Sequence, residues 1–325
     1  MTDEMTALTL SREAEDFEGL ALTRSAIPTP GPGEVLVRIR AAAVNFVDLL
    51  MSEGRYQYRP PLPYILGSDF AGEVVEGSAH FPTGTAVMGM ARGGAFATHI
   101  AVPADALTPK PAAFSFGQAA AFGQPYLTAH VALTRFGRLQ AGQWVLVHGA
   151  SGGVGLAAVD VAKRMGAHVI ATSASAAKLH IIADEYAPDA VLNVTESFRE
   201  DVKRITGGGA DLVYDPVGGD VFDESVRCVA FSGKYLVIGF ADGRIPTIAA
   251  NYPLIKGFAL VGVRAGEYGR RFPAHAAEDA SLLADMAQSG DVSPRIHAEF
   301  ALADWRQAFE TMRRREVVGR VVLTV

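Results

Sequence analysis

The stretch Trp144-Val145-Leu146-Val147-His148, followed by Gly149-Ala150-Ser151-Gly152-Gly153-Val154-Gly155, decides the fold. The apolar run predicts a buried strand, and the apolar spacing over residues 154–165 predicts a helix. Glycines allow a sharp turn and a close approach of the backbone to a ligand, and the helix start offers unpaired N–H groups. The stretch therefore predicts a dinucleotide pyrophosphate loop, with Ala150 in the first position of the G-x-G-x-x-G pattern and contacts from Ala150, Ser151, Gly152, Gly153, Val154 and Gly155.

Strands and helices alternate after this stretch. Further strands are predicted at 169–171, 190–192, 212–214, 235–238 and 259–263, with helices at 175–185, 197–205 and 219–230. This rhythm indicates a parallel sheet with right-handed crossovers. In the tail we expect helices at 274–289 and 303–315 and a last strand at 317–323.

The first part of the chain has a different texture. Many glycines separate short apolar runs from Gly67 to about Val102, which predicts a compact β-rich domain. Within it we expect a strand at 35–40, a short helix at 41–52 and a loop at 54–68. A length of 325 residues is consistent with about two domains.

Composition excludes several classes of protein. Apolar residues make up 49% and charged residues 20%, as in folded globular chains, and the net charge of −6 argues against a nucleic-acid binder. The single cysteine, Cys228, excludes a disulfide framework and a Cys-rich zinc site, and we expect it buried in the 219–230 helix. No membrane segment or signal peptide is evident, so we expect a cytoplasmic protein.

The end of the second strand of the βα series selects the cofactor. NAD sites place an Asp or Glu there, against the ribose 2′-hydroxyl. This chain reads Ala171-Thr172-Ser173-Ala174-Ser175, with no acidic residue until Asp184. Ser173 and Lys178 could hold a 2′-phosphate, which favours NADPH over NADH; the alternative for Lys178 is a solvated helix face.

Several motifs together point to a family. They are Asn45–Asp48, Gly54–Tyr56, Gly67–Gly72, Tyr126–Ala129, Asp215–Gly219 and Gly319–Val322. With them the chain resembles the zinc-free, zeta-crystallin-like quinone oxidoreductases of the medium-chain dehydrogenase/reductase superfamily. The resemblance implies an α/β fold: a GroES-like β-barrel catalytic domain (1–123 with 266–325) and a Rossmann doubly wound parallel sheet (124–265). It also implies an active site in the cleft between domains and a homodimer through the edge of the Rossmann sheet, near 259–263.

The resemblance also implies site residues. Thr128 is expected at the nicotinamide and Arg315 at a phosphate. The alternatives are a helix-start residue for Thr128 and a basic helix end for Arg315. Val194 stands where relatives often have a Tyr that holds the adenosine phosphate. From their places after the fifth strand, Phe240 is expected beside the nicotinamide, and Asn251 follows a loop expected to close over the ligand.

Without a metal, the substrate must be polarised by hydrogen bonds. The candidate catalytic residues are Asn45, Tyr56 and Asp48; their alternatives are a turn-forming Asn, a packing Tyr and a local cap or salt bridge. The expected activity is NADPH-dependent reduction of quinones by hydride transfer. Two alternatives stay open: reduction of the C=C bond of α,β-unsaturated carbonyls, and a non-catalytic NADPH-binding or RNA-binding protein.

Overall fold

The computed structural model describes residues 4–325, which form two compact units. Unit 1 runs to Gln124 and resumes over Pro294–Val325, and unit 2 comprises Pro125–Ser293. Each unit has its own sheet system and its own apolar core.

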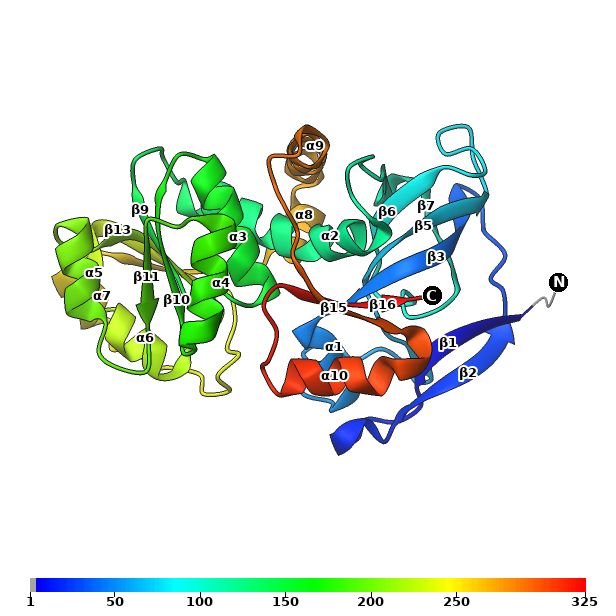
Figure 1. The fold of residues 1–325 in the computed structure, drawn as a ribbon, viewed down its shortest axis with the longest axis horizontal. Helices are drawn as coiled ribbons and strands as arrows, with labels where there is room; N and C mark the ends of the chain where they lie inside the picture. Colours follow the sequence, from blue (N-terminus) through cyan, green and yellow to red (C-terminus); the bar gives the residue numbers. More distant parts are fainter. Residues whose placement is uncertain (1–3) are drawn as a thin grey trace. The chain divides into compact units, whose positions relative to one another are not determined.

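Unit 1 is built mainly on antiparallel strands. Its larger sheet has the order β15-β16-β3-β5-β6-β8, with β7 also paired to β3, and a smaller sheet has the order β2-β1-β4 (Figure 1). Its core includes Leu8, Ile39, Phe70, Phe96 and Phe309, all at most 1% exposed. The elements are β1 (Glu4–Leu10), β2 (Leu20–Ala26), β3 (Glu34–Val44), α1 (Phe46–Ser52), β4 (Tyr64–Ile65), β5 (Asp69–Glu76), β6 (Ala86–Met90), β7 (His99–Pro103), β8 (Leu107–Pro109), β15 (Ile296–Ala301), α10 (Trp305–Arg313) and β16 (Arg320–Thr324).

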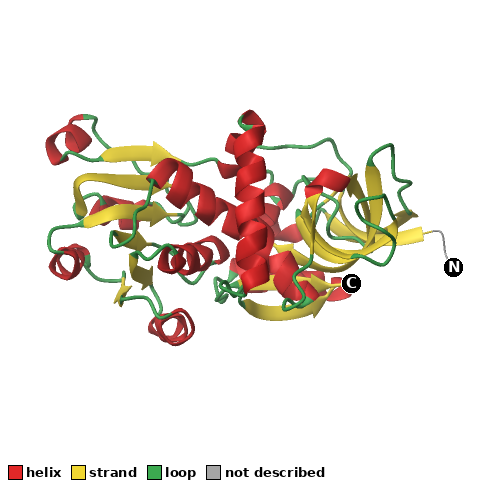
Figure 2. Ribbon diagram, turned by 90° about the horizontal axis from the view of Figure 1, so that it is seen from above, coloured by secondary structure: helices red, strands yellow, loops and turns green. Residues whose placement is uncertain are grey.

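Unit 2 is a parallel sheet of the order β11-β10-β9-β12-β13-β14, with helices on both faces (Figure 2). From β9 the chain adds β10 and β11 on one side of the sheet and β12, β13 and β14 on the other, so the topological switch point lies between β9 and β12. Ligands of such sheets bind at the carboxyl ends of the strands beside this point. The strands are β9 (Trp144–Val147), β10 (His168–Ser173), β11 (Ala190–Asn193), β12 (Ala210–Asp215), β13 (Val229–Val237) and β14 (Ala259–Gly262). The helices are α3 (Gly153–Arg164), α4 (Ala176–Tyr186), α5 (Arg199–Thr206), α6 (Gly219–Ser225), α7 (Asn251–Lys256), α8 (Ala265–Arg271) and α9 (Pro273–Ser289), and α2 (Phe116–Val131) contains the boundary between the units.

Three sequence-based expectations about elements are wrong. The helix expected at 41–52 begins only at Phe46, because Ala41–Val44 continue β3 and pair with β16. The helix expected at 219–230 ends at Ser225, so Cys228 lies in a bend before β13, although it is buried at 1% exposure as expected. The tail contains an unpredicted strand, β15, which pairs with β16 in parallel. Sheet pairing between distant segments decides the first and the last of these.

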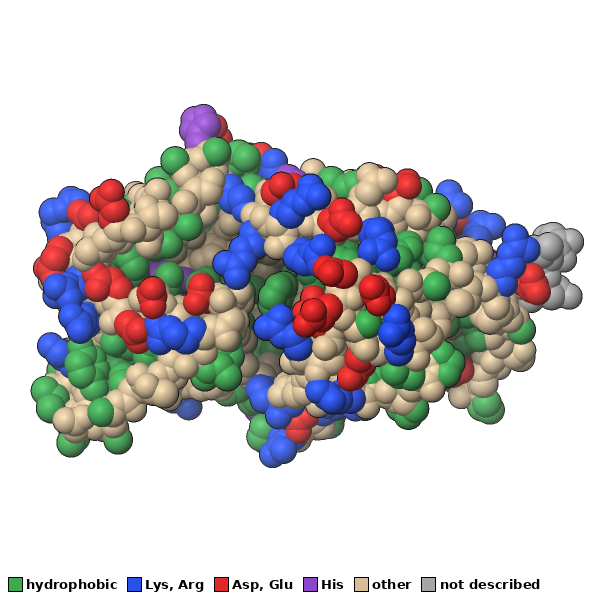
Figure 3. Space-filling model, turned by 90° about the horizontal axis from the view of Figure 1, so that it is seen from below, with side chains coloured by type: hydrophobic (Ala, Val, Ile, Leu, Met, Phe, Trp, Pro, Cys, Tyr) green, Lys and Arg blue, Asp and Glu red, His purple; other side chains and the backbone are tan. Residues whose placement is uncertain are grey.

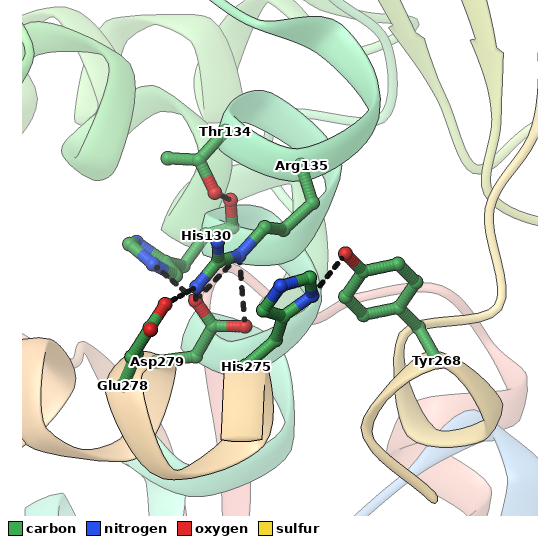
Figure 4. Close-up of polar contacts among 7 residues, drawn as sticks. All are labelled: His130, Thr134, Arg135, Tyr268, His275, Glu278 and Asp279. Carbon is green, nitrogen blue, oxygen red and sulfur yellow. Dashed lines mark hydrogen bonds and ion pairs between the residues drawn. The ribbon is translucent and has the colours of Figure 1, made fainter. Parts of the chain in front are cut away.

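The chain was expected to return to the first domain at residue 266. In the structure it returns to unit 1 at Pro294. The physical reason is a buried cluster that fixes α9 within unit 2 (Figure 4). Asp279, 1% exposed, accepts hydrogen bonds from the Arg135 guanidinium at 2.9 and 3.0 Å and lies 3.2 Å from His130 Nε2. Tyr268 of α8 adds a bond to His275 Nδ1 of α9 at 2.7 Å.

Acidic and basic side chains are interspersed over the face shown in Figure 3. None of the described helices combines the length and apolar character needed to cross a membrane. Within residues 4–325, His, Cys, Asp and Glu side chains do not gather in threes at a spacing that could hold a metal ion.

Candidate functional site

The glycine-rich loop joins β9 to α3 in unit 2. Gly149 has a positive φ of 55°, and its carbonyl accepts the Gly152 N–H at 2.9 Å, which closes a tight turn. A Cβ atom on Gly155 would lie 2.2 Å from the Gly149 carbonyl oxygen, far inside contact distance. Ala150 is fully buried, and its N–H donates to the Thr172 carbonyl of β10 at 3.0 Å. Backbone proximity therefore requires glycine at 155, and the loop is anchored to β10.

The start of α3 has the features of an anion site. Gly152 is the N-cap and, having no side chain, makes no cap hydrogen bond to the first turn. The first N–H groups of a helix have no intrahelical acceptor, and the helix dipole makes this end positive. Ser151, Gly152, Gly153 and Val154 are half-buried, so backbone N–H groups remain within reach of a ligand. The residues present fit a dinucleotide pyrophosphate.

The loop after β12 lies against the glycine-rich loop, and the loop after β13 lies against the loop after β12. A Cβ on Gly149 would lie 3.0 Å from Val217 Cγ2, and one on Gly218 would lie 3.0 Å from a ring carbon of Phe240. The loop after β12 is held by Asp215, whose carboxylate accepts the Val217 and Gly218 N–H groups at 2.7 and 3.0 Å. The structure thus brings the predicted residues 150–155 and Phe240 to one edge of the sheet.

The end of β10 carries hydroxyl groups and no acidic side chain. Ser173 is 7% exposed, and its Oγ accepts the Ser175 N–H at 3.2 Å. Ser175 caps α4, because its Oγ accepts the Lys178 N–H at 3.5 Å. Lys178 is half-buried in the first turn of that helix. Asp184, the first acidic residue after β10, lies on α4 and pairs with His180 at 3.3 Å.

A buried histidine, His148, directly precedes the glycine-rich loop and fixes its start by two side-chain hydrogen bonds. His148 is fully buried; its Nδ1 lies 2.8 Å from Thr172 Oγ1, and its Nε2 lies 2.6 Å from Ser225 Oγ. Burial lowers the pKa of His148 from 6.5 to about 4, so the ring is neutral near pH 7. The imidazole therefore links β9, β10 and the end of α6 directly before Gly149.

The remaining predicted cofactor residues are more dispersed. Thr128 is half-buried within α2, in the part that belongs to unit 2. Asn251 is exposed at the start of α7. Arg315 belongs to unit 1, is exposed, and follows α10 with a φ of 56°.

Unit 1 contains a second polar cluster, where β3 ends and β5 and β16 begin. Asn45 directly follows β3, Asp69 opens β5 and Arg320 opens β16, and all three are at most 7% exposed. Asn45 Nδ2 donates to Asp69 Oδ2 at 2.8 Å and to Ser68 Oγ at 3.1 Å. Arg320 Nη1 donates to Asn45 Oδ1 at 2.8 Å, and Arg320 Nη2 lies 3.4 Å from Asp69 Oδ2. Antiparallel pairing of the three strands brings these groups together.

Asp48, another predicted catalytic residue, is the third residue of α1 and forms a capping box with the N-cap residue Asn45. Its Oδ2 accepts the Asn45 N–H at 2.7 Å, and the residue is 3% exposed. Burial raises the pKa of Asp48 from 3.8 to about 7, although this backbone N–H lowers it. Tyr56, the third, is half-buried and packs against the core of unit 1.

Sequence reasoning assigned no role to Ser68, Asp69, Gln124 and Arg320. Gln124 donates its backbone N–H to Asp69 Oδ1 at 2.9 Å, and its buried Oε1 has no donor among residues 4–325. The motifs Gly67–Gly72 and Gly319–Val322 contained three of these residues. The signal available in the sequence was one charged residue in each motif, Asp69 and Arg320, each at the start of an apolar β-strand run.

Comparisons with known proteins agree with this geometry. Residues 31–112 match the family described as alcohol dehydrogenase GroES-like domain, and residues 153–281 match the family described as zinc-binding dehydrogenase. A quinone oxidoreductase-like protein 2 homolog of Nematostella vectensis is 36% identical over 301 residues, covering 90% of this chain and 82% of that protein. The mouse quinone oxidoreductase-like protein 2 is 35% identical over 92% of this chain and 87% of its own length.

Solved structures show the same fold. A mycobacterial protein in complex with NADPH superposes with a TM-score of 0.90 at 28% identity, covering 99% of this chain and 100% of its own. The quinone oxidoreductase of Pseudomonas syringae has a TM-score of 0.89 at 28% identity, with the same coverage. The chain therefore belongs to the medium-chain dehydrogenase/reductase superfamily of oxidoreductases, in its quinone oxidoreductase-like branch.

Proposed function

We propose that this protein is a metal-free reductase that uses NADPH to reduce quinones. The observation that carries the cofactor preference is the end of β10, where Ser173 and Ser175 stand in place of an acidic residue. A carboxylate there would repel a 2′-phosphate, whereas hydroxyl groups and the Lys178 ammonium attract it. The NADPH complex of the mycobacterial relative supports this preference.

The chain's groups for the reaction are distributed over both units. NADPH, when bound, supplies a hydride to the acceptor. The glycine-rich loop and the start of α3 hold its pyrophosphate, and Thr128, Phe240, Asn251 and Arg315 are proposed as further contacts. In unit 1, Asn45, Asp48 and Tyr56 are proposed to surround the acceptor. The buried cluster there consists of amide, hydroxyl, carboxylate and guanidinium groups, which act by hydrogen bonding.

An α,β-unsaturated carbonyl is the second candidate acceptor. Hydride addition to its C=C bond also places negative charge on a carbonyl oxygen, so the same hydrogen-bond donors would stabilise the transition state. Exposed apolar side chains adjoin the cluster: Phe46 follows Asn45, and Met90 pairs with Asp69 in the sheet, at 41% and 39% exposure. They suit an apolar acceptor of either class.

Initial rates of NADPH oxidation test the proposal. The purified protein is assayed with an ortho-quinone and, in parallel, with an alkyl enone, and each assay is repeated with NADH. We expect quinone turnover that is faster with NADPH than with NADH. Turnover of the enone alone would indicate a reductase of C=C double bonds. Tight NADPH binding without turnover of either compound would contradict a reductase of this kind.

We also propose a homodimer through the edge of the unit 2 sheet. Strand β14 pairs with β13 on one side only, which leaves backbone groups for a second strand. Beside this edge, Phe231, Leu254 and Ile255 are 83%, 80% and 72% exposed, and a Cβ on Gly257 would touch the Phe231 ring at 2.3 Å. An apolar patch next to an open strand fits a second copy of the same edge.

Mass measurement by light scattering tests this proposal. The wild type is expected at twice the chain mass, and the double variant Leu254→Lys, Ile255→Lys at the chain mass. Leu282→Lys, an exposed leucine on α9, is the control and is expected to remain dimeric. A monomeric wild type at micromolar concentration would contradict the proposal.

A further inference from the structure

The orientation of the Asn45 amide follows from its partners. Arginine has only donors, so the Asn45 atom that lies 2.8 Å from Arg320 Nη1 must be the carbonyl oxygen. The amide nitrogen is then directed to Ser68 and Asp69. Asp69 is an acceptor when ionised, and Arg320 beside it stabilises the ionised form, while burial raises the pKa of Asp69. The direction of each hydrogen bond in the cluster is therefore determined.

A count of hydrogens shows which group can still donate. Asn45 Nδ2 has two hydrogens and three acceptors within reach: Asp69 Oδ2 at 2.8 Å, Ser68 Oγ at 3.1 Å and, at the limiting distance of 3.5 Å, the Ala43 carbonyl oxygen. The two shorter bonds use both hydrogens. Asn45 thus has no hydrogen left for a ligand. Ser68 Oγ accepts one of these bonds, and its own hydroxyl hydrogen has no acceptor among the described residues. Ser68 is half-buried, so this hydrogen can reach a ligand.

The surroundings of Ser68 suit a carbonyl compound. The Ser68 carbonyl accepts the Ala91 N–H at 2.8 Å, which holds the residue beside the end of β6 and its exposed Met90. Phe46, also exposed, directly follows Asn45. A polar hydrogen flanked by apolar side chains offers one directed contact to an otherwise apolar molecule.

We propose that the Ser68 hydroxyl donates a hydrogen bond to the carbonyl oxygen of the acceptor, with Asn45 and Arg320 as positioning residues behind it. This inference rests on the proposed function and replaces Asn45 as the direct donor. As hydride arrives at the acceptor, its oxygen gains negative charge, and the hydrogen bond from Ser68 strengthens. Ser68 keeps its proton, and the proton that completes the product comes from water.

The chain of bonds makes Ser68 a better donor than an isolated serine. The Arg320 guanidinium polarises the Asn45 amide, and the amide donates to Ser68 Oγ, which fixes the hydroxyl in position. Hydrogen bonds in series polarise one another in a buried environment. A preorganised donor of this kind does not have to reorient during the reaction.

The variant Ser68→Ala tests the proposal, with Ser78→Ala as a matched control. Ser78 is also a half-buried serine of unit 1, follows the other end of β5, and accepts one hydrogen bond, from the Phe81 N–H at 3.3 Å. We expect Ser68→Ala to lower kcat/KM for the acceptor by about 10- to 100-fold, the effect of losing one hydrogen bond to a charged group, and to leave the Kd for NADPH unchanged. Ser78→Ala should change neither quantity, and Ser68→Thr, which keeps a hydroxyl, should retain most of the rate.

A second readout separates polarisation from packing. Across substituted 1,4-benzoquinones, the loss caused by Ser68→Ala should be largest for the least electron-poor acceptors, since these depend most on the donor. An equal loss for all acceptors, or a weakened Kd for NADPH, would assign Ser68 a structural role and overturn the inference. Wild-type rates in Ser68→Ala would overturn it while leaving the proposed function intact. A wild type that reduces no acceptor would overturn both.

Discussion

The substitution Gly152→Asp should stabilise the fold and abolish cofactor binding, because the same position caps α3 and, as we propose, faces the cofactor pyrophosphate. A Cβ on Gly152 would meet only the Gly149 carbonyl oxygen, at 3.4 Å, and the backbone has a φ of −78° and a ψ of 162°. These angles suit any residue, and Asp is a favoured N-cap. The side chain therefore fits without strain.

Two opposite magnitudes follow. A carboxylate at a helix N-terminus gains about 0.3–1 kcal/mol from the dipole, so the free energy of unfolding of the ligand-free protein should rise slightly. Against a pyrophosphate about 4 Å away, one unit of like charge costs about 4 kcal/mol at an effective dielectric constant of about 20. That cost corresponds to a Kd for NADPH about 1,000-fold weaker.

Gly152→Asn is the matched control, since its side chain has nearly the same shape and cap preference but no charge. Urea unfolding measures the free energy of unfolding. Titration with NADPH, followed by the change in NADPH fluorescence, measures the Kd for NADPH. Asn shares whatever steric effect Asp has, so the ratio of the two dissociation constants isolates the charge. Equal binding by the Asp and Asn variants would refute the assignment of this helix start to the phosphate.

Three further substitutions have defined outcomes. Gly155→Ala should lower the free energy of unfolding by about 1–3 kcal/mol in urea unfolding, because its Cβ would lie 2.2 Å from the Gly149 carbonyl oxygen. Wild-type stability would show that the loop is not tightly packed. Lys178→Ala should raise the Kd for NADPH more than that for NADH, and an equal effect on both would remove Lys178 from the 2′-phosphate site. Burial lowers the pKa of His148 from 6.5 to about 4, so its contribution to stability is present above pH 6.5 and lost as the pH falls toward 4. The free energy of unfolding of the wild type, relative to that of His148→Asn, should therefore rise by up to about 3 kcal/mol between pH 4 and 6.5. A difference in urea unfolding that does not change with pH would contradict this. The comparison with the variant is needed because burial raises the pKa of Asp48 from 3.8 to about 7, so the contribution of Asp48 to stability falls with rising pH over the same range.

The nucleotide half of the protein was largely predictable from sequence. Residues 144–155 contain a complete strand, turn and helix start, so the information is local, and the positions of Ser173 and Phe240 follow from where neighbouring strands end. One error arose where distant segments pair, because Ala41–Val44 have no strand signal of their own and extend β3 by pairing with β16. A second has a local cause: Gly123 and Pro125 lie within α2, so the sequence does not indicate a helix there.

The cluster in unit 1 was not predictable for the same reason. Asn45, Asp69 and Arg320 are separated by up to 275 positions and meet only because β3 pairs with both β5 and β16. The resemblance to a family drew attention to Asn45 and Asp48. It could not reveal that both hydrogens of the Asn45 amide are already bonded, because hydrogen-bond direction depends on Arg320.

The charges of this cluster also bear on why a hydroxyl, rather than a charged group, is left to meet a ligand. Arg320 and Asp69 are within 3.4 Å and together are close to neutral. Asp48 is the third ionisable group, and because burial raises its pKa to about 7, a large fraction of it is protonated near neutral pH. With Asp48 protonated, the cluster presents no net negative charge to an acceptor oxygen that becomes anionic during hydride addition. An additional lysine or arginine would stabilise that oxygen more strongly but would have to be desolvated among apolar neighbours, at a cost of several kcal/mol. A serine hydroxyl oriented by an amide and a buried guanidinium supplies directed polarisation without that cost.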